Sequence, residues 1–539
     1  MPGPPLPPLD DLGKRYVSEL FDFSPGEARA NGDHSYDGRQ GPVGAAATAH
    51  RVAQLATLAS ELDRVAAADV EERADQITLR HRLALEHFRL VELDAGRRNP
   101  LSAIFRGADP QPYCTHDYAP VPVRAEGLAQ QLEGLPGWLD AALDELGDSL
   151  DAGPRRVAIG VARGLAAFYS NDIDATLPLP DHPDLRALLQ GRAAAAGRAC
   201  ARFAEAIEVR QATPDAALGE RRFLAMLEAQ EGVSESLPGL RAMADAELAQ
   251  LRGRFVEVAH GIAGSGGVAE AVAMMESDHP AAASLIDEAA ASLDRLRQFW
   301  RDGDALSIPE APCRVIASPP YLRFVTAALD PAGTLAEATV ESNYLVTPVD
   351  ESMSERQAEE WLRTFNRWSL ENIAVHEVYP GHFVHFVHAR RQRSLVRRVG
   401  FVAGFGEGWA HYAEQLAIEQ GLAEGRPILH LAQIHDALLR ACRFRATLML
   451  HTEGASVDDA TTLFVSSSGM AEFPARREAE RGTYDPMYLA YTYGKLRILE
   501  WRAELEKRPG FSLRGFHETM LASGFPPLAA VRELVLNAE

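Results

Sequence analysis

Residues 376–382, His-Glu-Val-Tyr-Pro-Gly-His, combine side chains that bind metals with side chains that move protons. In the zinc-hydrolase signature H-E-x-x-H, two histidines four residues apart bind the ion from one helical face, and the intervening glutamate acts as general base. Here His376 and His382 are six residues apart. On a straight helix this spacing is a rotation of about 600°, so the two imidazoles would point roughly 120° apart and could not share one ion.

Pro380 and Gly381 lie inside this stretch and change the geometry. A proline cannot donate a hydrogen bond to the carbonyl of His376, and its ring clashes there, so the helix must open or bulge. Gly381 supplies the backbone freedom to absorb two extra residues. We therefore predict a looped-out turn that returns His382 to His376.

Two further histidines, His385 and His388, form a rival pair three residues apart. No glutamate stands beside either of them, so the residues of a hydrolytic site are incomplete there. We expect these two side chains to pack in the interior or to support the metal ligands.

A second candidate segment is Gly-Phe-Gly-Glu-Gly-Trp-Ala-His-Tyr-Ala-Glu at residues 404–414. A catalytic two-histidine zinc site needs a third protein ligand and an open position for water. Glu407, His411 and Glu414 share one helical face, and a carboxylate on the first turn of such a helix can approach the histidine pair. The alternative is a surface helix with a solvated acidic face. The helix has an apolar side that argues against this alternative, formed by Trp409, Tyr412, Ala413 and Leu416.

These segments, with others along the chain, resemble the successive motifs of a bacterial family known as domain of unknown function 885, whose members are assigned as metallopeptidases mostly by inference. The matching stretches are GDHSYDGR, HEVYPGH, EGWAHYAE, YDPMYLAYTYGKLRILEWR and LRGFHETMLASGFPPL, which span most of the chain. The segment EGWAHYAE is also similar to the NEGFxxYxE helix of gluzincin aminopeptidases, whose glutamate is the third zinc ligand. Carried over, that ligand is Glu407.

The resemblance implies a mainly helical, gluzincin-like fold with a few short strands beside the active-site cleft. It also implies zinc-dependent peptide hydrolysis with one Zn²⁺ per chain. The chain departs from the usual family pattern at Phe383 and His385, which replace polar residues, and at His411, which replaces an aliphatic one. The expected ligands are intact, so these departures affect the substrate pocket and the residues around the ligands.

Under this hypothesis His376, His382 and Glu407 bind the zinc ion. The ion lowers the pKa of a bound water and polarises the scissile carbonyl. Glu377 takes a proton from that water and delivers it to the leaving amine.

A tyrosine is the expected donor to the oxyanion, because gluzincins commonly use one from a later helix. Tyr491 is our candidate, with Tyr493 and Tyr484 as rivals that would otherwise be packing residues. His411 and Glu414 are expected to orient the metal ligands.

Substrate recognition has weaker candidates. Arg481, Lys495 and Arg497 flank the tyrosines, and one of them would bind a peptide carboxylate, unless they form a solvated basic face. The segment around Asn343 and Tyr344 is predicted to be an edge strand that pairs with an extended peptide, with both side chains lining the cleft.

The rest of the chain predicts a mainly α architecture. Residues 1–12 are proline-rich and predict a flexible arm. We place a soft boundary near residue 305, between an N-terminal helical half, 13–305, and a catalytic helical half, 306–539, packed as one body. Short strands are expected within 312–324 and 338–350, where β-branched and aromatic residues gather between prolines. Amphipathic spacing predicts helices at 48–93, Leu185–Glu208, Asp215–Glu231, Gly239–Ala263, Ala281–Arg301 and from about Glu355 onward.

Composition limits the partners. The chain has 539 residues, 46% hydrophobic and 24% charged, and a net charge of −22, which repels nucleic-acid phosphates and anionic membranes. Its four cysteines form no close pair, and its N-terminus lacks the features of a signal peptide. We therefore expect a cytoplasmic protein whose partner is a short peptide or peptide-like molecule, with no nucleic acid and no membrane.

Two other functions are compatible with the same residues. One is a metal-dependent tailoring hydrolase or cyclase acting on a small-molecule metabolite. The other is a non-catalytic helical binding protein with a structural metal. A structural zinc site normally has four protein ligands, often cysteines, and no cysteine is near this motif. The sequence leaves open the substrate, the choice between exo- and endopeptidase, and the oligomeric state.

Overall fold

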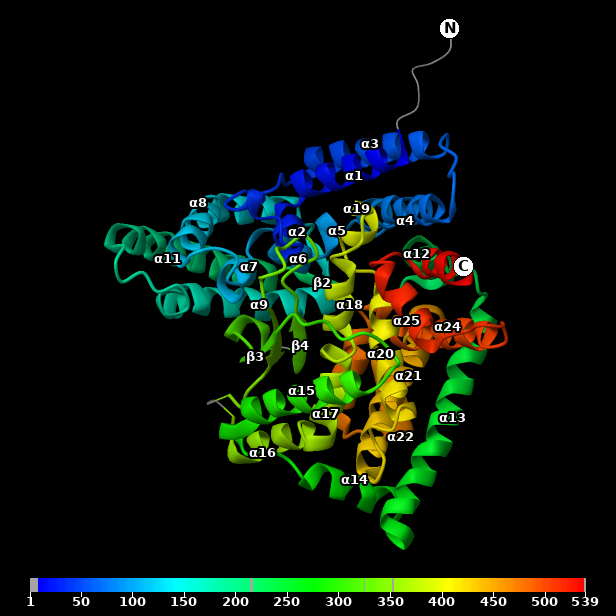
Figure 1. The fold of residues 1–539 in the computed structure, drawn as a ribbon. Helices are drawn as coiled ribbons and strands as arrows, with labels where there is room; N and C mark the ends of the chain where they lie inside the picture. Colours follow the sequence, from blue (N-terminus) through cyan, green and yellow to red (C-terminus); the bar gives the residue numbers. More distant parts are fainter. Residues whose placement is uncertain (1–7, 214–216, 324, 351–352, 538–539) are drawn as a thin grey trace.

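The computed structural model describes residues 8–213, 217–323, 325–350 and 353–537 (Figure 1). These residues are mainly helical, with 71% in helices and 4% in strands, and the strands form two small sheets. The predicted fold class, mainly α with a few short strands, is therefore confirmed.

Of the N-terminal helices, α1 (Leu9–Phe23), α3 (Ala45–Leu62) and α4 (Val70–His87) lie at the top of Figure 1. The first of them, α1, starts at Leu9, so the prediction of a flexible arm over residues 1–12 is wrong for residues 9–12. Leu9 and Leu12 are buried in a cluster that includes Val396, and this burial holds the first turn in place. Residues 1–7 lie outside the described residues. The helices of this part are α1 (Leu9–Phe23), α2 (Pro25–Ala30), α3 (Ala45–Leu62), α4 (Val70–His87), α5 (Ala95–Arg98), α6 (Pro100–Gly107) and α7 (Gln111–Thr115).

A second group of long helices projects to one side of the molecule in Figure 1 and has its own apolar core. It consists of α8 (Val121–Glu145), α9 (Ala152–Asn171), α10 (Ile173–Thr176) and α11 (Pro183–Glu208). The two-stranded parallel sheet of β1 (Ser149–Asp151) and β2 (Gln211–Thr213) joins the ends of these helices.

The three-stranded sheet lies next to the histidine segment. Its order is β3-β5-β4, where β3 is Cys313–Ala317, β4 is Ala327–Asp330 and β5 is Ser342–Val346. Strand β5 is parallel to β3 and antiparallel to β4. The prediction that the segment around Asn343 and Tyr344 forms an edge strand is wrong. All five residues of β5 are buried, which is typical of a strand paired on both sides.

The remaining helices include those that carry the candidate site. They are α12 (Gly219–Glu231), α13 (Leu237–Ala263), α14 (Gly267–Ser277), α15 (Leu285–Asp302), α16 (Glu355–Thr364), α17 (Arg367–Glu377), α18 (His382–Ala389), α19 (Leu395–Arg398), α20 (Ala403–Glu419), α21 (Pro427–Thr452), α22 (Val457–Ser468), α23 (Glu472–Gly482), α24 (Ala490–Leu505), α25 (Leu513–Ala522) and α26 (Leu528–Leu536). The largest apolar core includes residues on both sides of position 305, such as Leu240 and Leu448. The two halves of the sequence on either side of residue 305 therefore share one apolar core.

Helices α20 and α24 approach each other at glycines. A Cβ atom on Gly494 would lie 1.8 Å from the carbonyl oxygen of Gly404, and one on Gly408 would lie 2.7 Å from the backbone of Gly494. No larger residue fits at these positions without moving the helices apart. This contact sets the distance between the helix that carries Glu407 and the one that carries Tyr491.

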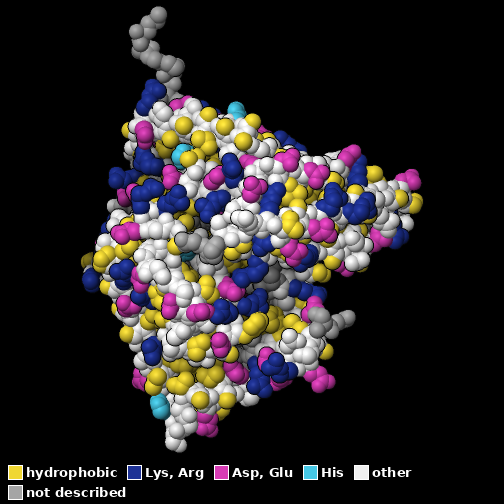
Figure 2. All heavy atoms as spheres, turned by 180° about the vertical axis from the view of Figure 1, so that it is seen from behind, with side chains coloured by type: hydrophobic (Ala, Val, Ile, Leu, Met, Phe, Trp, Pro, Cys, Tyr) yellow, Lys and Arg dark blue, Asp and Glu magenta, His cyan; other side chains and the backbone are white. Residues whose placement is uncertain are grey.

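The surface carries both signs of charge. Figure 2 shows acidic and basic side chains interspersed over the face opposite to that in Figure 1. Among the described residues, no helix combines the length and the apolar composition needed to cross a bilayer.

Candidate metal centre

The helix is interrupted between the two histidines. Helix α17 ends at Glu377 and α18 begins at His382, and the Gly381 N–H donates a hydrogen bond to the carbonyl of Val375 at 3.0 Å. The intervening loop is therefore folded back onto the last turn of α17. A Cβ on Gly381 would lie 1.7 Å from the carbonyl oxygen of His376, so only glycine fits at this turn.

Two buried tryptophans hold the loop. The indole N–H of Trp300, on α15, donates to the carbonyl of Tyr379 at 3.0 Å. The indole N–H of Trp409, on α20, donates to the carbonyl of Pro380 at 3.0 Å. The break removes helical partners from these carbonyls, and the indoles satisfy them in the protein interior.

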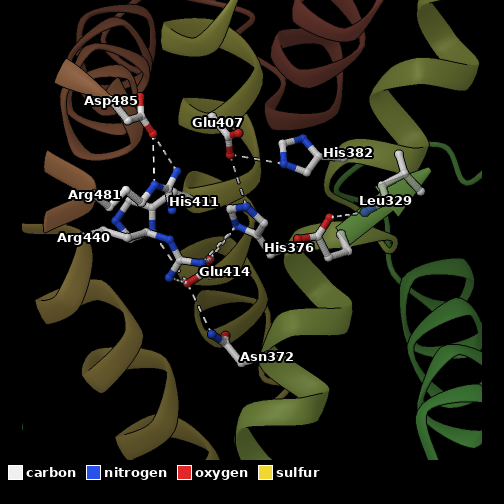
Figure 3. Close-up of polar contacts among 11 residues, drawn as sticks. Leu329, Asn372, His376, His382, Glu407, His411, Glu414, Arg440, Arg481 and Asp485 are labelled. Atoms are coloured by element: carbon white, nitrogen blue, oxygen red, sulfur yellow. Dashed lines mark hydrogen bonds and ion pairs between the residues drawn. The ribbon is translucent and has the colours of Figure 1, made fainter. Parts of the chain in front are cut away.

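The loop brings three side chains together. His376 Nε2 lies 3.4 Å and His382 Nε2 lies 3.2 Å from the same oxygen, Glu407 Oε2. Figure 3 shows Glu407 facing both imidazoles. The two rings are 4.8 Å apart and nearly perpendicular, at 89°. The convergence predicted from Pro380 is thus present in the structure.

These three side chains fit a metal ion. Ligand atoms about 2.0–2.2 Å from a tetrahedral zinc lie about 3.3 Å from one another, close to the two distances to Glu407 Oε2. This oxygen is buried, and the described residues give it no properly oriented hydrogen bond. His382 Nδ1 is also without a hydrogen bond there. Two imidazoles and one carboxylate are a donor set that zinc commonly accepts.

The electrostatics of the cluster also favour a cation. Burial raises the pKa of Glu407, but the two imidazoles outweigh burial and place it below its usual range. Burial and Arg440 lower the pKa of His376, but its contacts with Glu407 and Glu414 outweigh both and raise it to about 9. The carboxylates thus stay ionised: Arg440 balances the charge of Glu414, and a proton on His376 faces Glu407.

Glu414 contacts the far side of His376. Its Oε1 atom accepts a hydrogen bond from His376 Nδ1 at 2.7 Å, which leaves Nε2 directed at Glu407. Arg440 donates to this fully buried carboxylate at 3.3 Å and forms an ion pair with it at 2.9 Å, and Asn372 donates to it at 3.3 Å (Figure 3). A carboxylate in this place fixes the tautomer of a metal-binding histidine. The contact with His376 Nδ1 is the geometry that the predicted orienting role of Glu414 requires. The role itself stays a prediction.

His411 lies one turn after Glu407 and is completely buried. Neither of its ring nitrogens makes a hydrogen bond within the described residues, and its closest carboxylate oxygen belongs to Glu414, at 3.6 Å. Burial, followed by the charge of Lys495, lowers the pKa of His411 to about 3. It is therefore a neutral imidazole beside Glu414, outside the group of three converging ligands.

Glu377, the expected general base, contacts strand β4. Its Oε2 atom accepts a hydrogen bond from the Leu329 N–H at 2.7 Å (Figure 3). The neighbouring Asp330 is held by His116 at 3.0 Å and by Asn343 at 3.1 Å. Strand β4 and the residues that anchor it could not be predicted, because Ala-Ala-Leu-Asp is too short and too ordinary in composition to indicate a strand.

Two other residues near the site also escaped the sequence analysis. Asn372 lies four residues before His376, on the same helical face, and this spacing could have indicated it. Arg440 lies on α21, far away in the sequence, and no local pattern connects it with the histidines.

Tyr491 is the tyrosine that the structure brings to the cluster. Its ring is 6.1 Å from that of His376 and nearly parallel to it. The guanidinium groups of Arg440 and Arg443 lie 5.8 and 5.3 Å from its ring centre. Burial and the charge of Glu407 raise its pKa to about 12, so the phenol stays protonated and can donate a hydrogen bond at neutral pH.

Three other candidates on α24 have partners away from the cluster. Tyr493 donates to Glu235 at 2.8 Å, and Arg497 binds the same carboxylate at 3.0 Å. Lys495 forms a buried pair with Glu247 at 2.9 Å. Tyr493 and Tyr491 lie on opposite faces of α24, because two residues along a helix correspond to a rotation of about 200°.

Tyr484 and Arg481 precede α24. The Tyr484 ring packs on Gly153 of α9, where a Cβ would lie 2.6 Å from it. Arg481 binds Asp485 at 2.8 Å (Figure 3). Burial raises the pKa of Tyr491, and the charge of Arg481 lowers it. Of the two, Arg481 is the one near the candidate site.

The remaining candidates lie in the interior. Asn343 donates to the carbonyl of Thr115 at 2.9 Å, and Tyr344 is fully buried on the central strand, so neither lines a sheet edge. His385 Nε2 lies 2.7 Å from the Gly524 carbonyl. His388 Nε2 lies 3.3 Å from the Ser307 carbonyl. The two histidines contact backbone rather than each other's ring.

Comparison with known proteins identifies the family. A family model described as "Bacterial protein of unknown function (DUF885)" matches residues 25–535, so this chain belongs to that bacterial family. No curated protein matches the chain.

The solved structures with a similar fold include the following two. One, a "putative lipoprotein of unknown function" from Shewanella oneidensis, has 20% sequence identity and a TM-score of 0.76, covering 98% of this chain and 100% of that chain. The other, a "putative lipoprotein" from Colwellia psychrerythraea, has 18% identity and a TM-score of 0.80, covering 98% of both chains. At these identities the likeness establishes the fold alone.

Proposed function

We propose that this protein is a zinc-dependent hydrolase that cleaves peptide bonds in short peptides or peptide-like amides. The observation that carries the proposal is the convergence of His376, His382 and Glu407 on one point, with Glu377 next in sequence to the first of them. A purely structural site would have no use for the adjacent glutamate and would normally supply a fourth protein ligand.

Each residue near the site has a part in the proposed reaction. A bound zinc ion would polarise the substrate carbonyl and acidify a water molecule. Glu377 would accept a proton from the attacking water and pass it to the leaving amine. Its carboxylate accepts a hydrogen bond from the Leu329 N–H and would have to accept one from the water instead.

Tyr491 would stabilise the oxyanion. Its phenol remains protonated at neutral pH, because burial and Glu407 raise its pKa to about 12. A well-placed donor to a developing oxyanion lowers the barrier by about 3 kcal/mol. Glu414 would keep His376 in the tautomer whose Nε2 lone pair faces the ion.

The burial of the cluster supports a small substrate. The side chains of His376 and His382 are 5% and 9% exposed, and that of Glu407 is 18% exposed. A folded protein could not place its backbone against groups so deep within the helices, whereas a short flexible peptide could.

The test combines metal analysis with an activity screen. The purified chain should bind one Zn²⁺, and a library of dipeptides to decapeptides should be cleaved with zinc and not after chelation. Mass spectrometry of the products distinguishes peptide hydrolysis from cyclisation or hydrolysis of a metabolite, which is the alternative reaction at the same residues. A chain that takes up no divalent ion would exclude both.

The expected location, the cytoplasm, is also a proposal. The support for it is that the four cysteines form no close pair, which is typical of a reducing compartment. The two solved structures described above are each named a putative lipoprotein. Fractionation of cells that produce the full-length protein, followed by detection in the cytosol and membrane fractions, would test it.

A further inference from the structure

An aromatic surface adjoins the metal centre on the side of His382. We call it the aromatic wall and define it as Phe386, Phe401 and Phe525. The ring of Phe401 lies edge-on to that of His382, with centres 5.7 Å apart. Phe401 is 5.5 Å from Phe525 and stacks in parallel on Phe386 at 6.2 Å, while Phe386 and Phe525 are 4.5 Å apart.

Phe401 is the member of the wall that solvent reaches most. It is 42% exposed, whereas Phe525 is completely buried and Phe386 is half-buried. Its position depends on a missing side chain, because a Cβ on Gly406 would lie 2.3 Å from the Phe401 ring. The ring therefore lies directly on the first turn of α20, one residue before Glu407.

The wall rests on a fixed base. The Phe525 N–H donates to the carbonyl of Arg397 at 2.7 Å, and Arg82 donates to the carbonyl of Phe525 at 3.3 Å. The ring of His385 is 4.1 Å from Phe525, and burial lowers the pKa of His385 to about 3. The side of the base formed by His385 is therefore uncharged at neutral pH.

We propose that Phe401, backed by Phe386, forms one side of a subsite that binds a bulky apolar or aromatic substrate side chain next to the bond being cleaved. This inference rests on the proposed hydrolase function. A large aromatic ring half-open to water gains favourable burial when an apolar group covers it, and ring-on-ring contact adds to that gain. The wall carries no charge that would bind a charged side chain, and its contact with His382 places an occupant beside the metal ligands.

The first experiment measures binding and needs no turnover. Zinc-loaded wild-type protein is titrated by calorimetry with acetohydroxamate and with 3-phenylpropionohydroxamate, whose shared group binds zinc. We expect the phenyl compound to bind at least about tenfold more tightly, in the range that small apolar groups give in a pocket. Phe401→Ala should reduce that ratio to within about threefold of one, and Phe401→Leu should give an intermediate ratio.

Phe105→Ala is the matched control. Phe105 is 44% exposed, nearly as much as Phe401, but lies on α6 in the N-terminal part. Its replacement should leave the ratio unchanged. Equal affinities of the two compounds for the wild type, or an equal loss of both in Phe401→Ala, would overturn the subsite.

A second measurement separates this inference from the hydrolase proposal. If the protein binds no zinc, the metal-free chain is titrated with 3-phenylpropionamide and acetamide. A phenyl preference that Phe401→Ala removes would support the subsite while the hydrolase proposal fails, and the lack of any preference would reject both. If peptides are cleaved, kcat/KM for a series with Ala, Leu or Phe beside the bond should lose its size preference in Phe401→Ala.

Discussion

At the scale of single residues, the site depends on which atom each charged group contacts. Glu377 and Glu414 are both carboxylates close to His376, yet they have different partners. Glu377 contacts the N–H of Leu329 on a strand, and Glu414 is fixed by His376, Arg440 and Asn372. Among the described residues Glu377 has one hydrogen-bond partner, which a water could replace, whereas Glu414 cannot move without breaking several contacts.

Glu377→Gln should abolish turnover and preserve metal binding. The amide can still accept from Leu329 but cannot take a proton, so we expect kcat to fall about 100- to 10,000-fold, with zinc near one per chain. Peptide hydrolysis and metal analysis on the same sample measure both. Glu360→Gln, at an exposed site on α16, is the control and should be as active as the wild type. Activity that survives in Glu377→Gln would exclude Glu377 as the base.

Glu414→Gln should weaken zinc binding about 10- to 100-fold, because the substitution removes the anionic acceptor of the His376 Nδ1–H. Competition with a zinc chelator measures the affinity. Glu419→Gln is the control on the same helix, since that carboxylate pairs with Arg502 rather than with His376. Equal zinc affinities for the wild type and both variants would show that Glu414 does not support the metal site.

At the scale of elements, the loop between α17 and α18 and the glycine contact between α20 and α24 position the site. The loop was predictable, because Pro380 and Gly381 break the helix within the sequence that must bring two histidines together. The face formed by Glu407 and Glu414 was also predictable from helical spacing. Three other features were not predictable, because they depend on contacts between distant segments. They are the central position of β5, the short strand β4 and the contact of Arg440 with Glu414.

Gly381→Ala should disrupt the metal centre. The new Cβ would lie 1.7 Å from the His376 carbonyl oxygen, so the loop must move and take His382 with it. We expect zinc binding to fall by at least about tenfold, and stability to fall by the amount typical of overpacking, about 1–3 kcal/mol. Chelator competition and thermal unfolding measure the two effects.

Gly160→Ala is the control for this change. Gly160 is on α9, and a Cβ there would meet no atom within 4 Å, so alanine should be neutral or stabilise the helix by up to about 1 kcal/mol. A Gly381→Ala variant that binds zinc as tightly as the wild type would contradict the proposed role of the loop.

At the scale of the whole molecule, the N-terminal and C-terminal parts of the chain meet at the site. Glu231, at the end of α12, accepts a hydrogen bond from the Gly404 N–H at 2.6 Å, at the start of α20. Burial raises the pKa of Glu231 to about 8, although backbone N–H groups partly oppose it. A residue before position 305 thus caps the helix that carries Glu407.

The raised pKa of Glu231 predicts that the stability of the folded protein depends on pH. Since its pKa is near 4.5 in the unfolded chain and about 8 in the folded one, the stability it contributes is present below pH 4.5 and is lost as the pH rises to 8. Glu231→Gln should therefore become more stable relative to the wild type between pH 5 and pH 9, by about 2–4 °C in Tm. Thermal unfolding of both proteins across this range measures it, and a difference that is constant with pH would refute it.

The two tryptophans that hold the loop between α17 and α18 give the protein an intrinsic fluorescence signal. Two of the six tryptophans, Trp300 and Trp409, bind consecutive carbonyls of the loop through their indole N–H groups. Any shift of the loop when an ion binds would change the polarity and hydrogen bonding of these fluorophores. Intrinsic emission, excited at the indole band, could then follow metal uptake in real time without a label.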